Sequence, residues 1–305
     1  MSTSDRIILV AINSGGSHTE MCISFSGGKQ TRYERSGSWK YTDIGIERSV
    51  SNMLQLIFDA ASPDVYDVLR VVISMSGASD EIRNREFETE FTHRSPFRQT
   101  HIHLEGDSLF SLRAAYGSHG SGFLMIAGTG SVVVAADRTG RVVKRGGWGR
   151  MLGDDGSGYW LGLESLRHYT KAIDGAERTG RLFELVREQI RSLVGSDFAD
   201  LRLALYSGKV SPAQFGRLIF EAGDDPAADE ILRNGAKHLV DLVRLIERET
   251  GGSIDRIVTR HGSVACSPIY SAAIARELGD GFELRTLHTD DVLGFALTEA
   301  AQLGR

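Results

Sequence analysis

The stretch GFLMIAGTGSVVVAA, residues 122–136, decides how this chain folds. The apolar run over residues 122–127 is short and predicts a buried strand, and the run over residues 132–136 predicts the strand that follows it. Gly128-Thr129-Gly130-Ser131 separates the two runs. Glycine adopts the dihedral angles that aim several backbone N–H groups at one point, so this turn suits a bound phosphate.

The same order of strand, glycine-containing turn and strand opens the chain. A β-branched run over residues 6–12 ends at Asn13-Ser14-Gly15-Gly16, and an alternating run over residues 21–25 follows. We predict further strands over residues 29–34 (after the Gly27-Gly28 turn), 68–75, 100–104, 141–144, 254–259 and 282–286. We predict helices over residues 50–61, from the Asp225-Pro226 cap to Gly251, and over residues 268–278 and 292–303. The pattern indicates an α/β protein with a duplicated fold and a ligand between its halves.

Composition excludes several classes of protein. The 305 residues carry 40 acidic and 35 basic side chains, and the net charge of −5 offers no field to attract nucleic acid or an anionic membrane. The two cysteines, Cys22 and Cys266, have neither disulfide-framework nor zinc spacing. No apolar run approaches the roughly 20 residues of a membrane helix, and Met1–Arg6 has no apolar stretch of a signal peptide. We therefore expect a cytoplasmic protein that binds neither nucleic acid nor membrane.

A third cluster, Arg260-His261-Gly262-Ser263, also follows an apolar strand. Each cluster taken alone is more typical of an ordinary hairpin turn, but three clusters in two halves favour a nucleotide-binding cleft. Neither GxxxxGK[ST] nor a helix-opening GxGxxG is present, which disfavours P-loop and Rossmann proteins.

The stretch GGWGRMLGDDGSGYWLG, residues 146–162, combines glycines, two tryptophans and two adjacent carboxylates. Such a loop is typical of sugar binding, because carboxylates match hydroxyls and an aromatic ring covers an apolar sugar face. The alternative is a turn-rich loop in which Trp148 and Trp160 are merely buried.

Residues 126–131 (IAGTGS) together with residues 146–158 (GGWGRMLGDDGSG) resemble N-acetylglucosamine kinases of the BadF/BadG/BcrA/BcrD ATPase family. The resemblance implies two ribonuclease-H-like domains of the actin-like ATPase type, with an interdomain cleft for ATP, Mg²⁺ and an amino sugar. It places one domain at residues 1–105 with 292–305 and the other at residues 106–291. It also implies a homodimer.

The resemblance assigns roles residue by residue. Asp107 matches the general base that contacts the sugar hydroxyl, and its alternative role is a helix N-cap. The implied ATP and phosphate contacts are Asn13, Gly15, Gly16, Ser17, Thr19, Gly128, Thr129, Gly130, Ser131, Gly262 and Ser263. The implied sugar contacts are Trp39, Lys40, Asp107, Thr129, Gly147, Trp148 and Asp154. Asn13 is expected to approach Mg²⁺ weakly, mostly through water.

The sequence departs from the family pattern at several of these positions. Asn13 stands where the family has an acidic residue, Ser14 is expected to add a side chain where the backbone should approach phosphate, and Gly106 replaces an Asn. The third cluster lacks one Gly of a Gly-Gly pair. These departures leave open an alternative, a catalytically weak or inactive sugar-binding relative.

Lys40 falls near an expected Asn that would contact the sugar. The resemblance implies an ATP-dependent kinase of an amino sugar such as N-acetylglucosamine, with N-acetylmuramic acid or glucosamine as further candidate substrates. One hypothesis is that the Lys40 charge favours an acidic sugar such as N-acetylmuramic acid, whose carboxylate needs a partner. The alternative is a solvated surface lysine.

Overall fold

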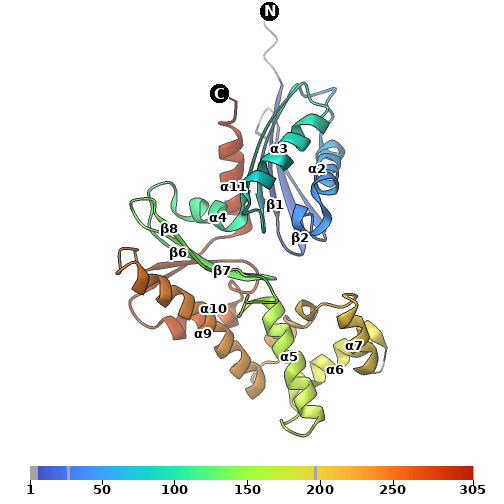
Figure 1. The fold of residues 1–305 in the computed structure, drawn as a ribbon, viewed down its shortest axis with the longest axis vertical. Coiled ribbons are helices and arrows are strands. Elements are labelled where there is room, and N and C mark those ends of the chain that lie inside the picture. Colours follow the sequence, from blue (N-terminus) through green and yellow to red (C-terminus); the bar gives the residue numbers. More distant parts are fainter. Residues whose placement is uncertain (1–5, 26–27, 196–197, 305) are drawn as a thin grey trace, which may run out of the picture. The chain divides into compact units, whose positions relative to one another are not determined.

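The computed structural model describes residues 6–25, 28–195 and 198–304, and the side chains of residues 198 and 199 are not described. Gly27 of the predicted turn lies outside these residues, as do residues 1–5. Backbone contacts divide the chain into two compact units (Figure 1): unit 1 is Met1–Gly117 with Leu287–Arg305, and unit 2 is Ser118–Thr286. The domain boundaries implied by the family resemblance stay a prediction.

Unit 1 contains a five-stranded mixed sheet in the order β3-β2-β1-β4-β5. The strand β1 pairs antiparallel with β2 and parallel with β4, while β3 and β5 form the edges. The strands are β1 (Ile7–Ser14), β2 (His18–Ser24), β3 (Gln30–Ser36), β4 (Val68–Met75) and β5 (Gln99–Gly106).

Helices cover both faces of this sheet. Alternate residues of β1, among them Ile8, Val10 and Ile12, join one apolar core with α2 and α3. The C-terminal helix α11 packs against β1 and β4. The helices are α1 (Tyr41–Ile44), α2 (Ile46–Ala60), α3 (Glu81–Arg94), α4 (Asp107–Tyr116) and α11 (Thr289–Ala300).

The helix α3 is an element that the sequence analysis did not predict. Asp80 caps it by accepting hydrogen bonds from the backbone N–H groups of Ile82 and Arg83. Its buried residues are Phe87 and Phe91, so its apolar stripe is too narrow to give a clear helical period.

Unit 2 repeats the topology of unit 1. Its five-stranded sheet has the order β10-β9-β6-β7-β8, with β6 antiparallel to β7 and parallel to β9. The position of β6 therefore corresponds to that of β1, and the predicted duplicated α/β fold is confirmed. The strands are β6 (Gly122–Ala127), β7 (Ser131–Ala136), β8 (Val142–Gly146), β9 (Ile257–His261) and β10 (Glu283–Thr286).

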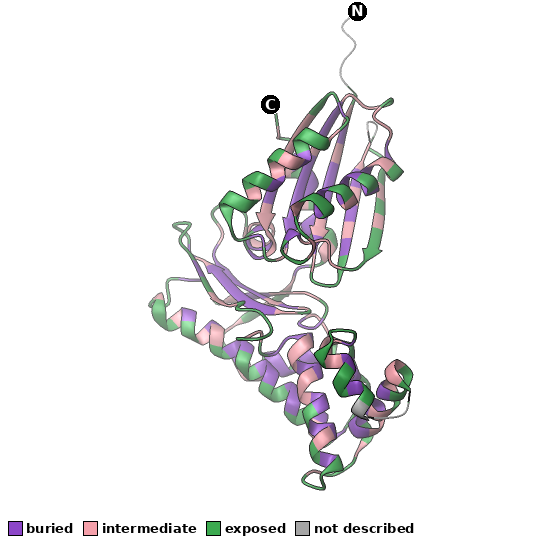
Figure 2. Ribbon diagram, turned by 45° about the vertical axis from the view of Figure 1, so that its right-hand side comes forward, coloured by how far each residue is buried: buried purple, intermediate pink, exposed green. Residues whose placement is uncertain are grey.

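The helices of unit 2 surround a core that includes Phe123, Leu161, Phe215 and Leu239. Figure 2 shows the buried residues gathered in the sheets and along the inner sides of the helices. The helical elements are α5 (Gly158–Ile173), α6 (Arg181–Val194), α7 (Phe198–Tyr206), the 3₁₀ helix η1 (Pro212–Phe215), α8 (Leu218–Glu221), α9 (Pro226–Glu249) and α10 (Pro268–Leu278).

Asp225 caps α9 as predicted, and it has a second role. One oxygen, Oδ1, accepts from the N–H groups of Ala227 and Ala228, while Oδ2 accepts from the N–H of Leu182 near the start of α6. One carboxylate thus holds two helix N-termini together. The α6 N-cap, Gly180, supplies no side-chain hydrogen bond of its own.

Several predicted ranges shift by a few residues. The strand predicted at residues 254–259 begins at Ile257, and the last helix begins and ends three residues earlier than predicted, at Thr289 and Ala300. Cys22 and Cys266 are half-buried free thiols. None of the helices in the described ranges is long and apolar enough to cross a membrane.

Candidate active site

The carboxyl ends of β1, β4 and β5 meet at one edge of the unit 1 sheet, because these strands run parallel. Asn13 pairs with Ser74, which in turn pairs with Glu105. The predicted phosphate turn and the predicted general base therefore both follow strands that end at this edge.

Asp107 is the first residue of α4 and is half-buried. The N-cap is Gly106, so the alternative role of Asp107 as the N-cap is wrong. Asp107 therefore lies in the first turn of α4, directly after the strand edge that also carries Asn13.

Gly106 stands at a close backbone crossing. A Cβ on this residue would lie 2.9 Å from the carbonyl oxygen of Ala78, in the turn after β4. An Asn at this position would force the two segments apart, so this close approach of the two backbones requires glycine at residue 106.

The β1–β2 hairpin forms the first predicted phosphate turn. The N–H of Gly15 donates to the carbonyl oxygen of His18 at 3.0 Å, and Gly16 and Ser17 are exposed at the tip. The carbonyl oxygen of Ser17 accepts from the N–H of Gly37, which ties the tip to the residue after β3. The turn is therefore held in place while its tip stays accessible.

Ser14 does not project from this turn. Its side chain is fully buried, and its hydroxyl lies 3.1 Å from the hydroxyl of Thr19, its partner across the hairpin. The expectation that Ser14 adds a side chain where the backbone approaches phosphate is wrong, because the alternation along β1 turns this side chain inward. Thr19 is equally buried, so we expect its hydroxyl to brace the turn.

Trp39 and Lys40 lie in the segment between β3 and α2. The Lys40 ammonium is 3.3 Å from a carboxylate oxygen of Asp43, and the Lys40 side chain is only 17% exposed. The alternative interpretation of Lys40 as a solvated surface lysine is therefore wrong. Burial alone would raise the pKa of Asp43, but the Ser38 hydrogen bond and the Lys40 charge hold the pKa of this carboxyl below its usual value.

Unit 2 has a corresponding edge where β6 and β9 end in parallel. Gly262 follows β9 with a φ of +91°, and a Cβ there would lie 2.6 Å from the carbonyl oxygen of Ala127 at the end of β6. The N–H groups of Val264 and Ala265 donate to that same oxygen. The loop after β6 and the loop after β9 are thus adjacent. Within the third cluster, Gly262 is the residue that must be glycine for these two backbone segments to approach each other. Ser263 beside it is exposed.

The loop between β6 and β7 packs against the start of α5. The carbonyl oxygen of Gly128 accepts from the N–H of Gly158 at 2.8 Å, so the positive end of a long helix adjoins the loop. A Cβ on Gly128 would meet nothing within 4 Å, and Thr129 is exposed. By contrast, the Ser131 hydroxyl is buried and donates to the carbonyl oxygen of Asp155, so it anchors the following loop.

Asp154 is brought to this same loop. Among the residues that the structure describes, Asp154 is the one non-glycine residue with a positive φ, which is 61°. A Cβ built on Gly130 would lie 2.7 Å from Oδ2 of Asp154. A residue predicted to contact sugar thus adjoins a residue predicted to contact phosphate.

Trp148, in the glycine-rich loop after β8, is 75% exposed, so the alternative that it is merely buried is wrong. Gly147, just before it, packs closely on Val132: a Cβ there would lie 3.1 Å from a Val132 methyl carbon. Trp160 is half-buried against His238.

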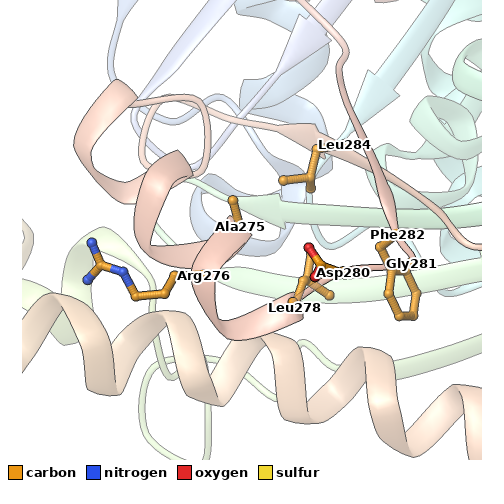
Figure 3. Close-up of a pocket in the computed structure, with 8 residues that line it drawn as sticks. Ala275, Arg276, Leu278, Asp280, Gly281, Phe282 and Leu284 are labelled. Carbon is orange, nitrogen blue, oxygen red and sulfur yellow. The ribbon is translucent and has the colours of Figure 1, made fainter.

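A hollow of about 460 Å³ lies elsewhere in unit 2, between the end of α10 and the start of β10 (Figure 3). Leu278, Asp280 and Phe282 line it. Because β9 and β10 run parallel, this hollow lies at the edge where the strands begin, opposite the loops after β6 and β9. It is separate from the candidate site.

The oxygen groups near Asn13 fit a hydrated cation. Within the described ranges, no cluster of three His, Cys, Asp or Glu side chains could hold a metal ion. Asn13 offers a neutral oxygen, and the buried hydroxyl of Ser74, its strand neighbour, has no hydrogen-bond partner among the described residues. Mg²⁺ usually keeps several waters and binds mainly through substrate phosphates. The neutral oxygen of Asn13 is compatible with a hydrated Mg²⁺ ion that arrives with a nucleotide, whereas the Ser74 hydroxyl is enclosed by protein.

The model of the BadF/BadG/BcrA/BcrD ATPase family matches residues 10–280. The chain belongs to this family. The match runs from β1 into the loop before β10, and so includes every predicted site residue of both units.

Relatives of this family member include an N-acetyl-D-glucosamine kinase of Dictyostelium discoideum, 25% identical over 95% of this chain and 97% of the relative. An N-acetylmuramic acid/N-acetylglucosamine kinase of Clostridium acetobutylicum is 40% identical over 17% of each chain. The solved structure of an N-acetylglucosamine kinase candidate from Chromobacterium violaceum has a TM-score of 0.69 at 24% identity, covering 97% of this chain and 99% of that one. This structure supports the fold.

Sequence reasoning missed two residues next to the site. Asp43 neutralises Lys40, and Asn84 of α3 bonds to both Tyr41 and the turn beside Gly106. The i, i+3 spacing of Lys40 and Asp43 was a usable signal for the ion pair. Asn84 gave no signal, because its partners are remote in sequence or belong to the backbone.

Proposed function

We propose that this chain is an ATP-dependent kinase that phosphorylates a hydroxyl group of a neutral amino sugar of the N-acetylglucosamine class. The observation that carries the proposal is the half-buried Asp107 at the N-terminus of α4, at the strand edge that also bears the β1–β2 turn. The named activities of the relatives support the same reaction.

In the proposed reaction, the Asp107 carboxylate accepts the proton of the sugar hydroxyl as that oxygen bonds to the γ-phosphorus of ATP. The bond between the γ-phosphorus and the bridging oxygen breaks, and ADP leaves with the bond's electrons. The chain contributes mainly orientation and charge stabilisation, since phosphoryl transfer needs little other help from side chains.

The proposed nucleotide contacts are backbone groups of the three turns. Gly15, Gly16 and Ser17 form the accessible first turn, and Gly128, Thr129 and Gly130 form the turn beside α5. We propose that Gly262 and Ser263 adjoin the adenosine, and that the buried Thr19 and Ser131 hold their turns in shape. Mg²⁺ bound with the nucleotide would offset phosphate charge, with Asn13 binding one of its waters.

The proposed sugar contacts are Trp39, Lys40, Thr129, Gly147, Trp148 and Asp154, in addition to Asp107. We favour a neutral sugar because Asp43 already pairs with the Lys40 ammonium, so Lys40 is not an unmatched cation for a sugar carboxylate. This weakens the expectation of an acidic sugar. The alternative of an inactive relative also loses one of its grounds, since Ser14 is buried rather than facing a phosphate.

We also propose that the two units correspond to the two domains of the family, that the protein acts in the cytoplasm, and that it forms a homodimer. The resemblance to the family supports the dimer, and light scattering of the purified chain tests it. A monomer at assay concentrations would refute this part.

ADP release with Mg²⁺-ATP tests the kinase proposal. We expect ADP release with N-acetylglucosamine, and less with N-acetylmuramic acid. Asp107→Asn removes the proton acceptor at nearly constant shape and is expected to lower kcat by about 100-fold or more. Sugar binding by calorimetry without ADP release, even at high Mg²⁺, would instead favour the inactive sugar-binding alternative.

A further inference from the structure

Asn84, on the first turns of α3, connects two segments that the proposed function uses. Its Oδ1 accepts a hydrogen bond from the Tyr41 hydroxyl at 2.9 Å, and its Nδ2 donates to the carbonyl oxygen of Ala78 at 3.2 Å. A single amide group thus acts as acceptor for one segment and donor for the other. Asp cannot supply this donor.

The Tyr41 side of this bridge belongs to the segment of residues 38–45, which we call the sugar segment because it carries Trp39 and Lys40. Tyr41 is 2% exposed and packs on Phe87 of α3, with ring centroids 6.1 Å apart. The Ser49 hydroxyl of α2 holds the same segment by donating to the Trp39 carbonyl oxygen. The sugar segment therefore rests on α2 and α3, which lie side by side (Figure 1).

The Ala78 side of the bridge is the turn that follows β4. The N–H of Ala78 donates to the Met75 carbonyl oxygen at 3.2 Å, and Met75 pairs with Gly106 across the sheet. The Ala78 carbonyl oxygen is also the atom that a Cβ on Gly106 would approach to 2.9 Å. The Ala78 carbonyl group thus lies close to the backbone of the residue directly before Asp107.

We infer that Asn84 is a positioning residue that fixes the position of the sugar segment relative to the backbone at Asp107. The inference rests on the proposed kinase function. Asn84 itself contacts neither reacting atom. Its loss frees the Tyr41 hydroxyl and the Ala78 carbonyl group, so both the sugar contacts and the general base lose their fixed geometry.

The test compares Asn84→Ala with Asp80→Ala. The control removes the N-cap of the same helix, whose carboxylate accepts from Ile82 and Arg83, and leaves the bridge in place. For Asn84→Ala we expect kcat/KM for the sugar to fall by about 10- to 100-fold, because small displacements of a reacting group are costly. The KM for ATP should stay within about twofold, since the ATP contacts lie elsewhere.

Two further variants each remove one of the two hydrogen bonds of Asn84. Tyr41→Phe breaks only the bond to the sugar segment and should chiefly raise the sugar KM. Asn84→Asp keeps an acceptor for Tyr41 but removes the donor to Ala78, and should chiefly lower kcat. Adding Tyr41→Phe to Asn84→Ala should cost little more than Asn84→Ala alone, since the two residues act as one unit.

The outcomes are distinguishable. A wild-type chain that releases no ADP with any amino sugar overturns the proposed function and this inference together. An active wild type in which Asn84→Ala and Asp80→Ala lower kcat/KM equally, or in which the ATP and sugar KM values change together, overturns the inference alone. The expected split between ATP and sugar KM supports it.

Discussion

Asp225 offers a sharp test of how unit 2 is held together. Its carboxylate accepts three backbone hydrogen bonds, at 2.9 and 3.2 Å from Ala227 and Ala228 of α9 and at 3.1 Å from Leu182 of α6. The residue is 7% exposed, and Leu182 and Ala228 are fully buried. Two of the three N–H donors therefore cannot turn to bulk water when the carboxylate is removed.

The cost of Asp225→Ala follows from these bonds. Loss of one N-cap costs about 1 kcal/mol, and two helix ends are affected. Unsatisfied buried N–H groups cost a further 1 kcal/mol or so, giving about 2–4 kcal/mol and a fall in Tm of roughly 4–12 °C. Asp225→Asn keeps one acceptor and turns an amide N–H₂ toward the remaining donor, so it should cost about half as much.

Urea unfolding followed by circular dichroism measures these differences, and hydrogen exchange at the start of α6 measures the local effect. Asp80→Ala is the matched control, because Asp80 caps only one helix, α3. It should cost about 1 kcal/mol. If Asp225→Ala destabilises the chain no more than Asp80→Ala, or if exchange at the start of α6 is unchanged, one carboxylate does not hold both helices.

Three further predictions concern the site. Gly262→Ala puts a Cβ 2.6 Å from the last carbonyl oxygen of β6. Gly281→Ala is the control, because Gly281 has a similar positive φ but the nearest atom to its added Cβ is 3.6 Å away. Both variants should lose stability, and only Gly262→Ala should also raise the ATP KM severalfold. If the two variants change the melting temperature and the ATP KM equally, the close approach of Gly262 to β6 does not affect ATP binding. Lys40→Ala should leave the preference for neutral over carboxylated amino sugars unchanged, because the Lys40 ammonium is already paired; a selective loss of activity on N-acetylmuramic acid would show that the charge is available. A carboxylate oxygen of Glu105 lies 3.8 Å from Nε2 of His103, and Glu105 raises the pKa of His103. Burial alone would raise the pKa of Glu105, but His103 and the charge of Arg113 hold the pKa of this carboxyl below its usual value. The Glu105 contribution to stability is present above about pH 4.3 and lost as pH falls through its lowered pKa, while the His103 contribution is present below about pH 6.5 and lost as pH rises through its raised pKa. His103→Gln should therefore destabilise the chain most near pH 5–6 and least at pH 9 in thermal melts; a pH-independent difference would contradict the pairing.

Much of the architecture was predictable because it depends on local chemistry. Glycine-containing turns between apolar runs located β1, β2, β6 and β7, and their recurrence indicated the duplicated sheet. The Asp225-Pro226 cap located the start of α9. The helix α3 was not predictable in this way, because its two buried phenylalanines give too little helical period.

The sequence by itself therefore determined the family, the order of strands and turns, and the chemical types of residue that follow the strand ends. Only the tertiary structure decided which of those side chains face a ligand. Alternation along β1 turned Ser14 inward, packing beside α2 paired Lys40 with Asp43, and the crossing at Ala78 required Gly106. The physical reason is that strand pairing, burial and backbone approach join segments that are far apart in the chain, and local sequence patterns do not specify such contacts.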